Sequence, residues 1–392
     1  MKKVGIVTSH TSFSSNYGAV LQCYALVEQL KLWGYEPNVI NYSYTNNNVE
    51  MTIDNSIDRS LNAKIKYIFS ADVSILQKFQ YRINRNNRNN MEKKFINFYE
   101  EFLPMHSKDK VTFDELCQHP LNYDYYITGS DQVWNPVIHG NQNDPCCFLR
   151  FAERESKKIA YAPSFGIKDY PKNLEDNLKK YVVDFDSLSV REKEGKEIIK
   201  RVCNIDVPVV LDPTLMADPI IYNVISKKPE NLPKKYILCY RFGNMEYSTK
   251  IIKEISKALR LPVVELPLSI ESYGKGSKLC YNIGPAEFIG AIQNAEVILT
   301  DSFHCTVFSI LNKKPFYTFL RQKENEKNNM NGRMIELLNK LNISERLISE
   351  EEKCRDLISK LYDIDYTSVY NILDRERNKS QEYLRKSLEN KR

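Results

Sequence analysis

The stretch VILTDSFH, residues 297–304, decides the expected fold. Its first four residues are apolar or β-branched and predict a buried strand, and Asp301 marks a turn. A helix should follow, with Ser302, Phe303 and His304 in its first turn. In open α/β sheets, ligands bind at the carboxyl ends of strands, where the N–H groups and dipole of the next helix favour an anion. The stretch therefore predicts an anion site in an α/β protein.

Two interpretations of this helix start are open. In the functional one, Ser302 and His304 hold a phosphorylated ligand and His304 can protonate it. In the structural one, Ser302 caps the helix and His304 is a packed side chain. Cys305, the next residue, is either a thiol nucleophile or a small buried residue.

Strands and helices alternate along most of the chain. In the first half, strands are predicted at 4–8, from 39 onward, and at 123–128, 158–161, 188–190 and 207–211, with a helix at 19–33. In the second half, strands are predicted at 236–240, 263–266, 297–300 and 315–319, with helices at 245–259, 287–294 and 305–311. This order is typical of parallel sheets, so we expect two Rossmann-like domains that face a cleft.

The chain has 392 residues, more than one hydrophobic core usually supports. We expect an amino-terminal domain over residues 1–215, a carboxyl-terminal domain over 216–348 and a helical tail over 349–392 that packs back on a domain face. Residues 44–102 interrupt the first domain and are predicted to be a helical insertion.

The insertion is strongly basic, because residues 59–94 contain only Asp72 and Glu92 as acids. One interpretation is contact with a membrane surface or an anionic acceptor. The other is a solvated face on a packed helical hairpin.

The composition is typical of a globular protein, with a net charge of +6. This charge is mild and spread out, so no nucleic-acid partner is expected, although an anionic substrate would suit it. The nine cysteines form no C-x-x-C pair, which favours reduced thiols. The short apolar run at 4–7 predicts a strand and not a signal peptide, and no stretch approaches a membrane span. We expect a cytoplasmic protein.

Polar turns follow several predicted strands at equivalent positions. The candidates are Asn16, Tyr17, Gly18, Ser130, Asp131, Gln132, Arg191 and Arg241. Each has a structural alternative, such as a turn glycine, an Asx turn or a surface ion pair. Nucleotide-binding and nucleophile-elbow motifs are missing, and the five histidines have no ligand spacing, so neither metal nor redox cofactor is expected.

Together these segments resemble the polysaccharide pyruvyl transferase family. The matching stretches are NYGAVLQ at 16–22, YITGSDQVWN at 126–135, AYAPSFG at 160–166, SVRE at 189–192, LDPTL at 211–215, TDSFH at 300–304 and an NGR plus LL pattern at 331–338. They keep the family's order over residues 4–346.

The resemblance implies a fold similar to GT-B glycosyltransferases. It also implies transfer of pyruvate from phosphoenolpyruvate, as co-substrate, to two hydroxyls of a sugar residue in polysaccharide biosynthesis, forming a cyclic ketal. Family members often begin the key helix with Arg-Leu-His and assign the Arg and His to phosphoenolpyruvate. Here His304 matches, but Ser302 replaces the arginine. The missing charge must then come from elsewhere, and the candidates are Arg191, Arg241, Arg321 and Arg333.

We expect the carboxyl-terminal domain to bind phosphoenolpyruvate and the amino-terminal domain to bind the acceptor, which is lipid-linked, nucleotide-linked or polymeric. His304 is our prediction for the phosphate ligand and proton donor, and Asp131 for the base that accepts the hydroxyl proton. Two other functions stay open: a nucleotide-sugar glycosyltransferase, and a non-catalytic glycan- or phosphate-binding protein. The lack of Asp or Glu at 302–323 argues against the glycosyltransferase, whose ribose is often held by an acid there.

Overall fold

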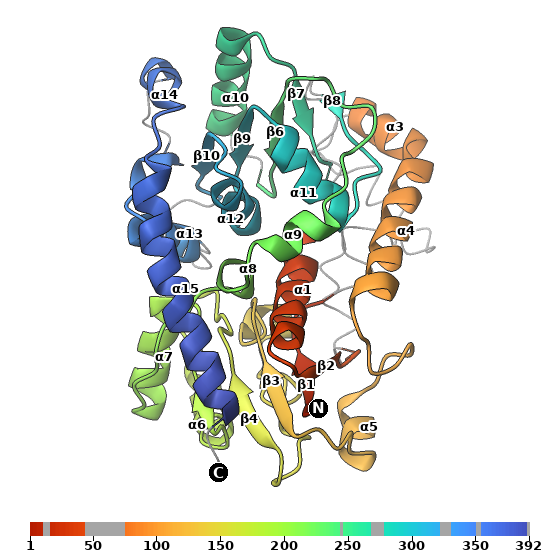
Figure 1. The fold of residues 1–392 in the computed structure, drawn as a ribbon, viewed down its shortest axis with the longest axis vertical. Coiled ribbons are helices and arrows are strands. Elements are labelled where there is room, and N and C mark those ends of the chain that lie inside the picture. Colours follow the sequence, from red (N-terminus) through yellow and green to blue (C-terminus); the bar gives the residue numbers. More distant parts are fainter. Residues whose placement is uncertain are drawn as a thin grey trace.

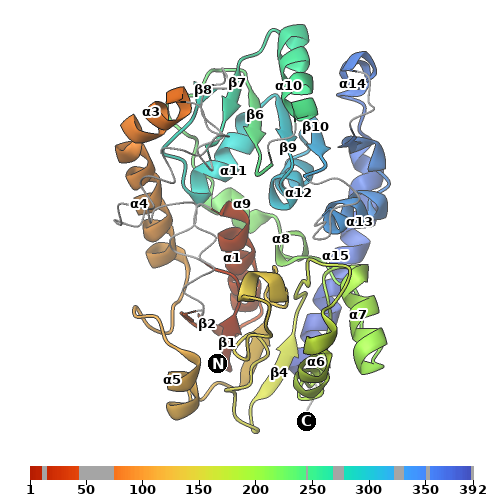
Figure 2. The same cartoon turned by 180° about the vertical axis from the view of Figure 1, so that it is seen from behind.

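A computed structural model of the chain shows two parallel sheets joined by short helices (Figures 1 and 2). The structure describes residues 1–10, 16–43, 75–243, 246–267, 278–321, 331–349 and 354–389.

The amino-terminal sheet consists of β1 (Lys3–Val7), β2 (Glu36–Val39), β3 (Tyr125–Thr128), β4 (Lys157–Ala160) and β5 (Ser187–Leu188). Its strand order is β2-β1-β3-β4-β5, and every pairing is parallel. The order changes direction between β1 and β3, so a crevice is expected at the carboxyl ends of these two strands.

The carboxyl-terminal sheet consists of β6 (Ile237–Tyr240), β7 (Val263–Glu265), β8 (Lys278–Leu279), β9 (Val297–Thr300), β10 (Phe316–Phe319) and β11 (Leu347–Ile348). Its order is β11-β10-β9-β6-β7-β8, which is the classical dinucleotide-fold order. The direction changes between β6 and β9, and β9 is the strand of the VILTDSFH stretch.

The helices surround and connect the sheets. They are α1 (Tyr17–Leu32), α3 (Ile75–Ile83), α4 (Arg85–Phe102), α5 (Phe113–Gln118), α6 (Glu175–Val182), α7 (Lys193–Cys203), α8 (Pro213–Met216), α9 (Ile220–Ile225), α10 (Glu246–Leu259), α11 (Pro285–Asn294), α12 (Phe303–Leu311), α13 (Gly332–Lys340), α14 (Cys354–Lys360) and α15 (Tyr366–Glu389). Short 3₁₀ turns occupy Pro136–His139, Lys172–Leu174 and Ser344–Arg346.

Helix α1 lies between the two sheets and is buried along most of its length (Figure 1). The Tyr17 ring stacks on Phe288 of α11 at a centroid distance of 4.4 Å, and its hydroxyl donates to the carbonyl of Ile283 at 2.9 Å. One apolar cluster runs from Ile6 of β1 through α1 to Leu238 of β6. A large apolar interface of this kind holds two domains in one relative position.

The insertion contributes to the same junction. Phe95 of α4 contacts the Tyr17 ring, and Lys94 forms a 2.7 Å ion pair with Glu287 of α11. The insertion therefore bridges the two sheets, in addition to covering the first domain.

The tail returns across both domains as α15 (Figure 1). Tyr370 donates to the carbonyl of Leu311 at 2.8 Å in the second domain, and Ser380 accepts a 3.0 Å hydrogen bond from the N–H of Leu211 in the first. Leu384 is completely buried. The tail is thus part of the folded core.

These observations confirm the predicted fold class, with its two Rossmann-like units, helical insertion and helical tail. The insertion over 44–74 and the start of the helix expected at 245 lie outside the described residues.

Two strand predictions are wrong. The second strand ends at Val39 instead of beginning there, because β2 is an edge strand whose Pro37 and polar neighbours conceal it in the sequence. Residues 207–211 form only one bridge, between Val209 and Val190, since Pro208 has no N–H to continue a ladder. The two-residue strands β8 and β11 were not predicted.

We expect Leu384→Ala to lower the free energy of unfolding by about 2–5 kcal/mol, because it opens a cavity where the tail meets the first domain. Chemical denaturation measures the change. Arg375→Ala is the control, since its side chain is exposed on the same helix, and should stay within about 0.5 kcal/mol of wild type. Equal effects would show that the tail does not stabilise the fold.

Candidate functional site

The two crevices meet where α1 and α12 begin. A Cβ atom added to Gly18 would lie 2.0 Å from Nδ1 of His304. Only a glycine allows the α1 backbone to approach the imidazole this closely. The structure thus brings together two sequence candidates that are 286 positions apart, one from each domain.

A buried carboxylate, Asp212, organises the polar groups around His304. Its Oδ2 atom accepts hydrogen bonds from Arg191 Nη1 at 2.8 Å and Ser130 Oγ at 3.1 Å, and lies 3.6 Å from His304 Nε2. Its Oδ1 atom accepts from the N–H and hydroxyl of Thr214, so Asp212 is also the N-cap of α8. Asp212 therefore links the first domain to the catalytic candidate of the second.

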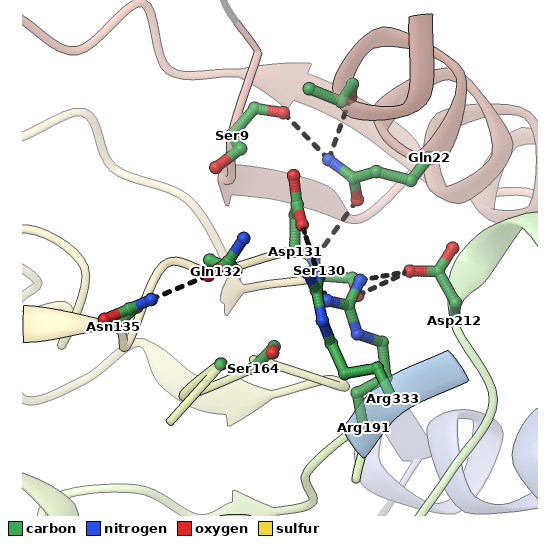
Figure 3. A network of polar contacts seen from close by, with 12 residues as sticks. Ser9, Gln22, Ser130, Asp131, Gln132, Asn135, Ser164, Arg191, Asp212 and Arg333 are labelled. Carbon is green, nitrogen blue, oxygen red and sulfur yellow. Dashed lines mark hydrogen bonds and ion pairs between the residues drawn. The ribbon is translucent and has the colours of Figure 1, made fainter. Parts of the chain in front are cut away.

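The arginines converge on a second carboxylate (Figure 3). Arg191 Nη2 lies 3.4 Å from Asp131 Oδ1, and Arg333 Nη1, from α13 of the other domain, lies 3.6 Å from the same atom. Both guanidinium groups lie over the Phe303 ring, with Arg191 at 5.1 Å and Arg333 at 5.9 Å from its centroid. Such cation–π contacts stabilise planar cations in a desolvated site.

Burial and charge act in opposite directions in this cluster. Burial alone would raise the pKa of Asp212, but the positive charges of His304 and Arg191 outweigh it and hold the pKa well below its ordinary value. Burial likewise opposes the charge on Arg191, but Asp212 and Asp131 raise its pKa. Arg333 differs, because burial and the neighbouring Arg191 charge lower its pKa to about 10. Its positive charge is thus the less compensated of the two.

The turn after β3 supports Asp131. Gly129 has φ +108° and approaches the Tyr161 carbonyl so closely that a Cβ atom would lie 2.3 Å from it. Asp131 itself has φ 61°, a left-handed conformation. The N–H of Ser130 donates to Gln22 of α1 at 3.3 Å (Figure 3). The turn is therefore fixed by both the sheet and α1, while Gln132 accepts a 2.6 Å bond from Asn135 beside it.

A small pocket opens at this junction. Its lining residues are Arg191, Val210, Leu211, Asp212, Leu215, Phe303, Arg333, Glu336, Leu337 and Lys340. The pocket combines apolar walls with a few charged groups, as is common in ligand sites. His304 is not among the lining residues, but its Nε2 atom lies 3.6 Å from Oδ2 of the lining residue Asp212.

Several donors in the cluster are buried without a hydrogen-bond acceptor. They are the Nε atoms of Arg191, Arg333 and Arg321 and the Nε2 atom of His304. Buried donors are nearly always satisfied in proteins. Of these donors, only those of Arg191 and Arg333 belong to residues that line the pocket, and the Oε1 atom of the lining residue Glu336 also has no hydrogen-bond partner. Two guanidinium donors of this kind would suit an anionic ligand.

Three of the predicted site residues cap a helix or pack between the domains in the part of the chain that the structure describes. Asn16 caps α1 by accepting from the N–H of Ala19, and Ser302 caps α12 by accepting from the N–H of Cys305. Tyr17 packs between the domains, as described above. Contact of these residues with a substrate stays a prediction.

Two predicted arginines pair elsewhere. Arg241 binds Glu265 of β7 at 2.9 Å, within its own domain. Arg321 donates to the carbonyl of Asp301 at 3.1 Å. Its positive charge also contributes to the lowered pKa of Arg333. Burial raises the pKa of Cys305 to about 12, which favours the packed thiol over the nucleophile.

Sequence reasoning did not select Asp212, Gln22 or Glu192 as site residues. Glu192 accepts from the Ser164 hydroxyl and the N–H of Phe165, and so holds the loop after β4 next to Arg191. All three lie inside the stretches that resemble the family. The sequence signal for Asp212 was its place in the LDPTL stretch. The same Asp-Pro-Thr pattern is common at ordinary helix starts, so it did not single out a functional residue.

One group of potential metal ligands is present among the described residues. His139, Asp144 and Cys147 have ligand atoms within 4.8 Å of one another. His139 Nε2 already contacts the Val133 carbonyl, and Asp144 accepts from the Tyr42 hydroxyl. This polar network holds the loop after β3 and is separate from the Asp212 cluster.

The fold is of the GT-B type, and a cluster of buried arginines and carboxylates lies at the junction of its two domains. The chain belongs to the polysaccharide pyruvyl transferase family, whose model matches residues 16–322. This identifies a transferase of polysaccharide modification. A search of curated proteins gave no significant match.

Solved structures support the fold. A UDP-GlcNAc 2-epimerase of Methanocaldococcus jannaschii, in complex with UDP-GlcNAc and UDP, is similar with a TM-score of 0.50 and 15% identity, over 99% of each chain. A candidate UDP-N-acetylglucosamine 2-epimerase of Listeria monocytogenes is similar with a TM-score of 0.52 and 11% identity, over 100% of this chain and 97% of that one. At these identities the likeness concerns the fold alone. In the described ranges no helix combines the length and apolarity needed to cross a membrane.

The contact between Gly18 and His304 predicts a coupled pair of substitutions. Gly18→Ala alone should destabilise the protein, because the new methyl group overlaps the imidazole. In a His304→Ala background the same change should lower the free energy of unfolding less, or raise it, since alanine favours a helix over glycine by about 1 kcal/mol. Chemical denaturation of the four proteins measures the coupling. Equal costs in both backgrounds would contradict the contact.

Asp212→Asn should lower the free energy of unfolding by about 3–5 kcal/mol at neutral pH, because it leaves Arg191 buried without its main partner. The folded pKa of Asp212 is below its unfolded value of about 3.9, so its ionisation stabilises the fold above that pH and less as the pH falls. The difference between wild type and variant should therefore shrink below about pH 4.

Denaturation across the acid range measures this difference. Asp206→Asn is the control, because that carboxylate is exposed and forms a surface ion pair with Lys196. A difference in the free energy of unfolding between wild type and Asp212→Asn that stays constant at low pH would contradict the ion-pair account.

Proposed function

We propose that the protein transfers pyruvate from phosphoenolpyruvate to two hydroxyls of a sugar residue, forming a cyclic ketal. The observation that supports this most is the undercompensated Arg333, which lines a pocket beside Arg191 in a chain of the pyruvyl transferase family.

The donor has two neighbouring anionic groups, a carboxylate and a phosphate. A planar guanidinium binds either group through two parallel hydrogen bonds. Arg191 and Arg333 come from opposite domains, so together they would hold the donor at the junction. An anion there would also offer a hydrogen-bond acceptor to the Nε atoms of Arg191 and Arg333, which have none, and would offset the charge of Arg333.

This arrangement accounts for Ser302. Where family members often have an arginine in the helix-start motif, this chain has a helix cap, and the missing positive charge is supplied from α13. We assign that charge to Arg333, because it lines the pocket and its pKa is lowered to about 10, whereas neither Arg241 nor Arg321 is a lining residue and Arg241 is paired with Glu265 at 2.9 Å.

The reaction consumes the double bond of the donor. A proton adds to the methylene carbon, and one sugar hydroxyl forms a bond to C2 and releases its proton. The C2–O bond to phosphate then breaks, and the second hydroxyl bonds to C2 and releases its proton. The products are the ketal and inorganic phosphate, and a positioned acid and base assist the proton transfers.

Two residues are our candidates for these roles. His304 is the proton donor or phosphate ligand, and Gly18 and Asp212 fix the position of its ring. Asp131, on the turn after β3, is the base for the acceptor hydroxyl.

Calorimetric titration with phosphoenolpyruvate, with UDP-GlcNAc as the control ligand, tests the proposal. Wild type should bind phosphoenolpyruvate, and Arg333→Gln should weaken binding by about 10- to 100-fold, the usual value of hydrogen bonds to a charged group. Arg375→Gln removes an exposed charge and should bind like wild type. Preference for UDP-GlcNAc, or wild-type affinity in Arg333→Gln, would overturn the assignment.

His304→Ala separates the two roles of the histidine. A phosphate ligand predicts weaker binding of phosphoenolpyruvate, whereas a proton donor predicts nearly unchanged binding and loss of turnover once an acceptor is supplied. Wild-type binding together with wild-type turnover would exclude both roles.

A further inference from the structure

Helix α3 exposes an apolar stripe that no described residue covers. Leu76, Phe79 and Ile83 are 56%, 61% and 60% exposed. They are three and four residues apart, so they lie on one face of the helix. Scattered exposed apolar residues are normal, but three on one short helix form a contiguous patch.

The other side of α3 is already occupied. Tyr81 is buried and lies under the Arg88 guanidinium, 3.5 Å from its ring centroid. The buried face of α4, with Phe95 and Phe98, packs on α1 through Tyr17 and Tyr24. Packing within the protein therefore explains the inner face of the insertion but not its outer stripe.

Exposed basic residues follow the stripe along the chain. Arg82 is exposed at the end of α3, and Arg85 is exposed at the start of α4. Lys93 is exposed further along α4. Across residues 75–99 the sequence has six basic residues and one acid, Glu92. Figures 1 and 2 show α3 at the outer edge of the molecule, beside the carboxyl-terminal sheet.

We propose that α3 docks the protein on an anionic phospholipid surface. Leu76, Phe79 and Ile83 would enter the boundary between headgroups and acyl chains, and Arg82, Arg85 and Lys93 would face the phosphates. A bilayer offers both components at once, whereas a free phosphate or nucleic acid would leave the apolar stripe unexplained.

Co-sedimentation with vesicles tests the docking itself, without any substrate. Wild type should bind phosphatidylcholine vesicles that contain phosphatidylglycerol and bind far less to phosphatidylcholine alone. Added salt should weaken the binding, and each removed basic residue should cost about fivefold. Arg82→Gln with Arg85→Gln should therefore lose about 25-fold.

The triple variant Leu76→Gln, Phe79→Gln and Ile83→Gln removes the stripe and should lose binding at least as strongly. The matched control is Ile220→Gln with Val224→Gln, because these apolar residues of α9 are comparably exposed elsewhere. The control should bind like wild type. Circular dichroism checks that each variant is folded.

Several results would overturn the proposal: no binding of wild type to anionic vesicles, equal binding to neutral ones, or unchanged binding of the triple variant. Sedimentation velocity adds a further outcome. A dimer that the triple variant abolishes, without vesicle binding, would show that a second copy of the chain covers the stripe. Because no phosphoenolpyruvate is present, failure here leaves the proposed function untouched, and the reverse is also true.

Discussion

The site depends on one buried contact, the approach of His304 to the amino end of α1. It requires a glycine at position 18, and it brings a residue of the second domain against the switch point of the first. Asp212 then completes the contact from the other side, with Arg191 and Ser130 as its partners. A charge this deeply buried is tolerated only because every one of its lone pairs faces a donor or a cation.

The packing of α1 makes this contact permanent. Its apolar face joins both sheets in one core, and α4, α8 and α15 reinforce the junction from different sides. Domains that share so large an apolar interface do not separate easily. The pocket is therefore held in shape by the fold.

Much of the architecture is predictable from the sequence because parallel strands are buried on both faces. The runs at β3, β6, β9 and β10 are continuous and apolar, and they are found almost to the residue. Edge strands are not predictable in this way, since β2 carries a proline and polar residues and β8 and β11 have two residues each. Residues 207–211 look like a strand, but Pro208 prevents a ladder.

The site is only partly predictable for a different reason. Polar residues after strands are visible in the sequence, so His304, Asp131 and Arg191 were selected. Arg333 was selected through the resemblance to the family, as a source of the missing positive charge. The pairing of charges is not visible, because it depends on distances between distant segments. Arg241 looks equivalent to Arg333 until Glu265 is seen beside it, and Asp212 looks like a helix cap until three partners surround it. Tyr17 follows a polar turn yet fills the core between the domains.

The most direct test of this account is an experimental structure of the protein with phosphoenolpyruvate bound. The account predicts the ligand in the pocket between the domains, with hydrogen bonds from Arg333 of α13 and Arg191 of the first domain and with His304 beside it. A ligand bound elsewhere, or one that leaves Arg333 in contact with Asp131 alone, would contradict it.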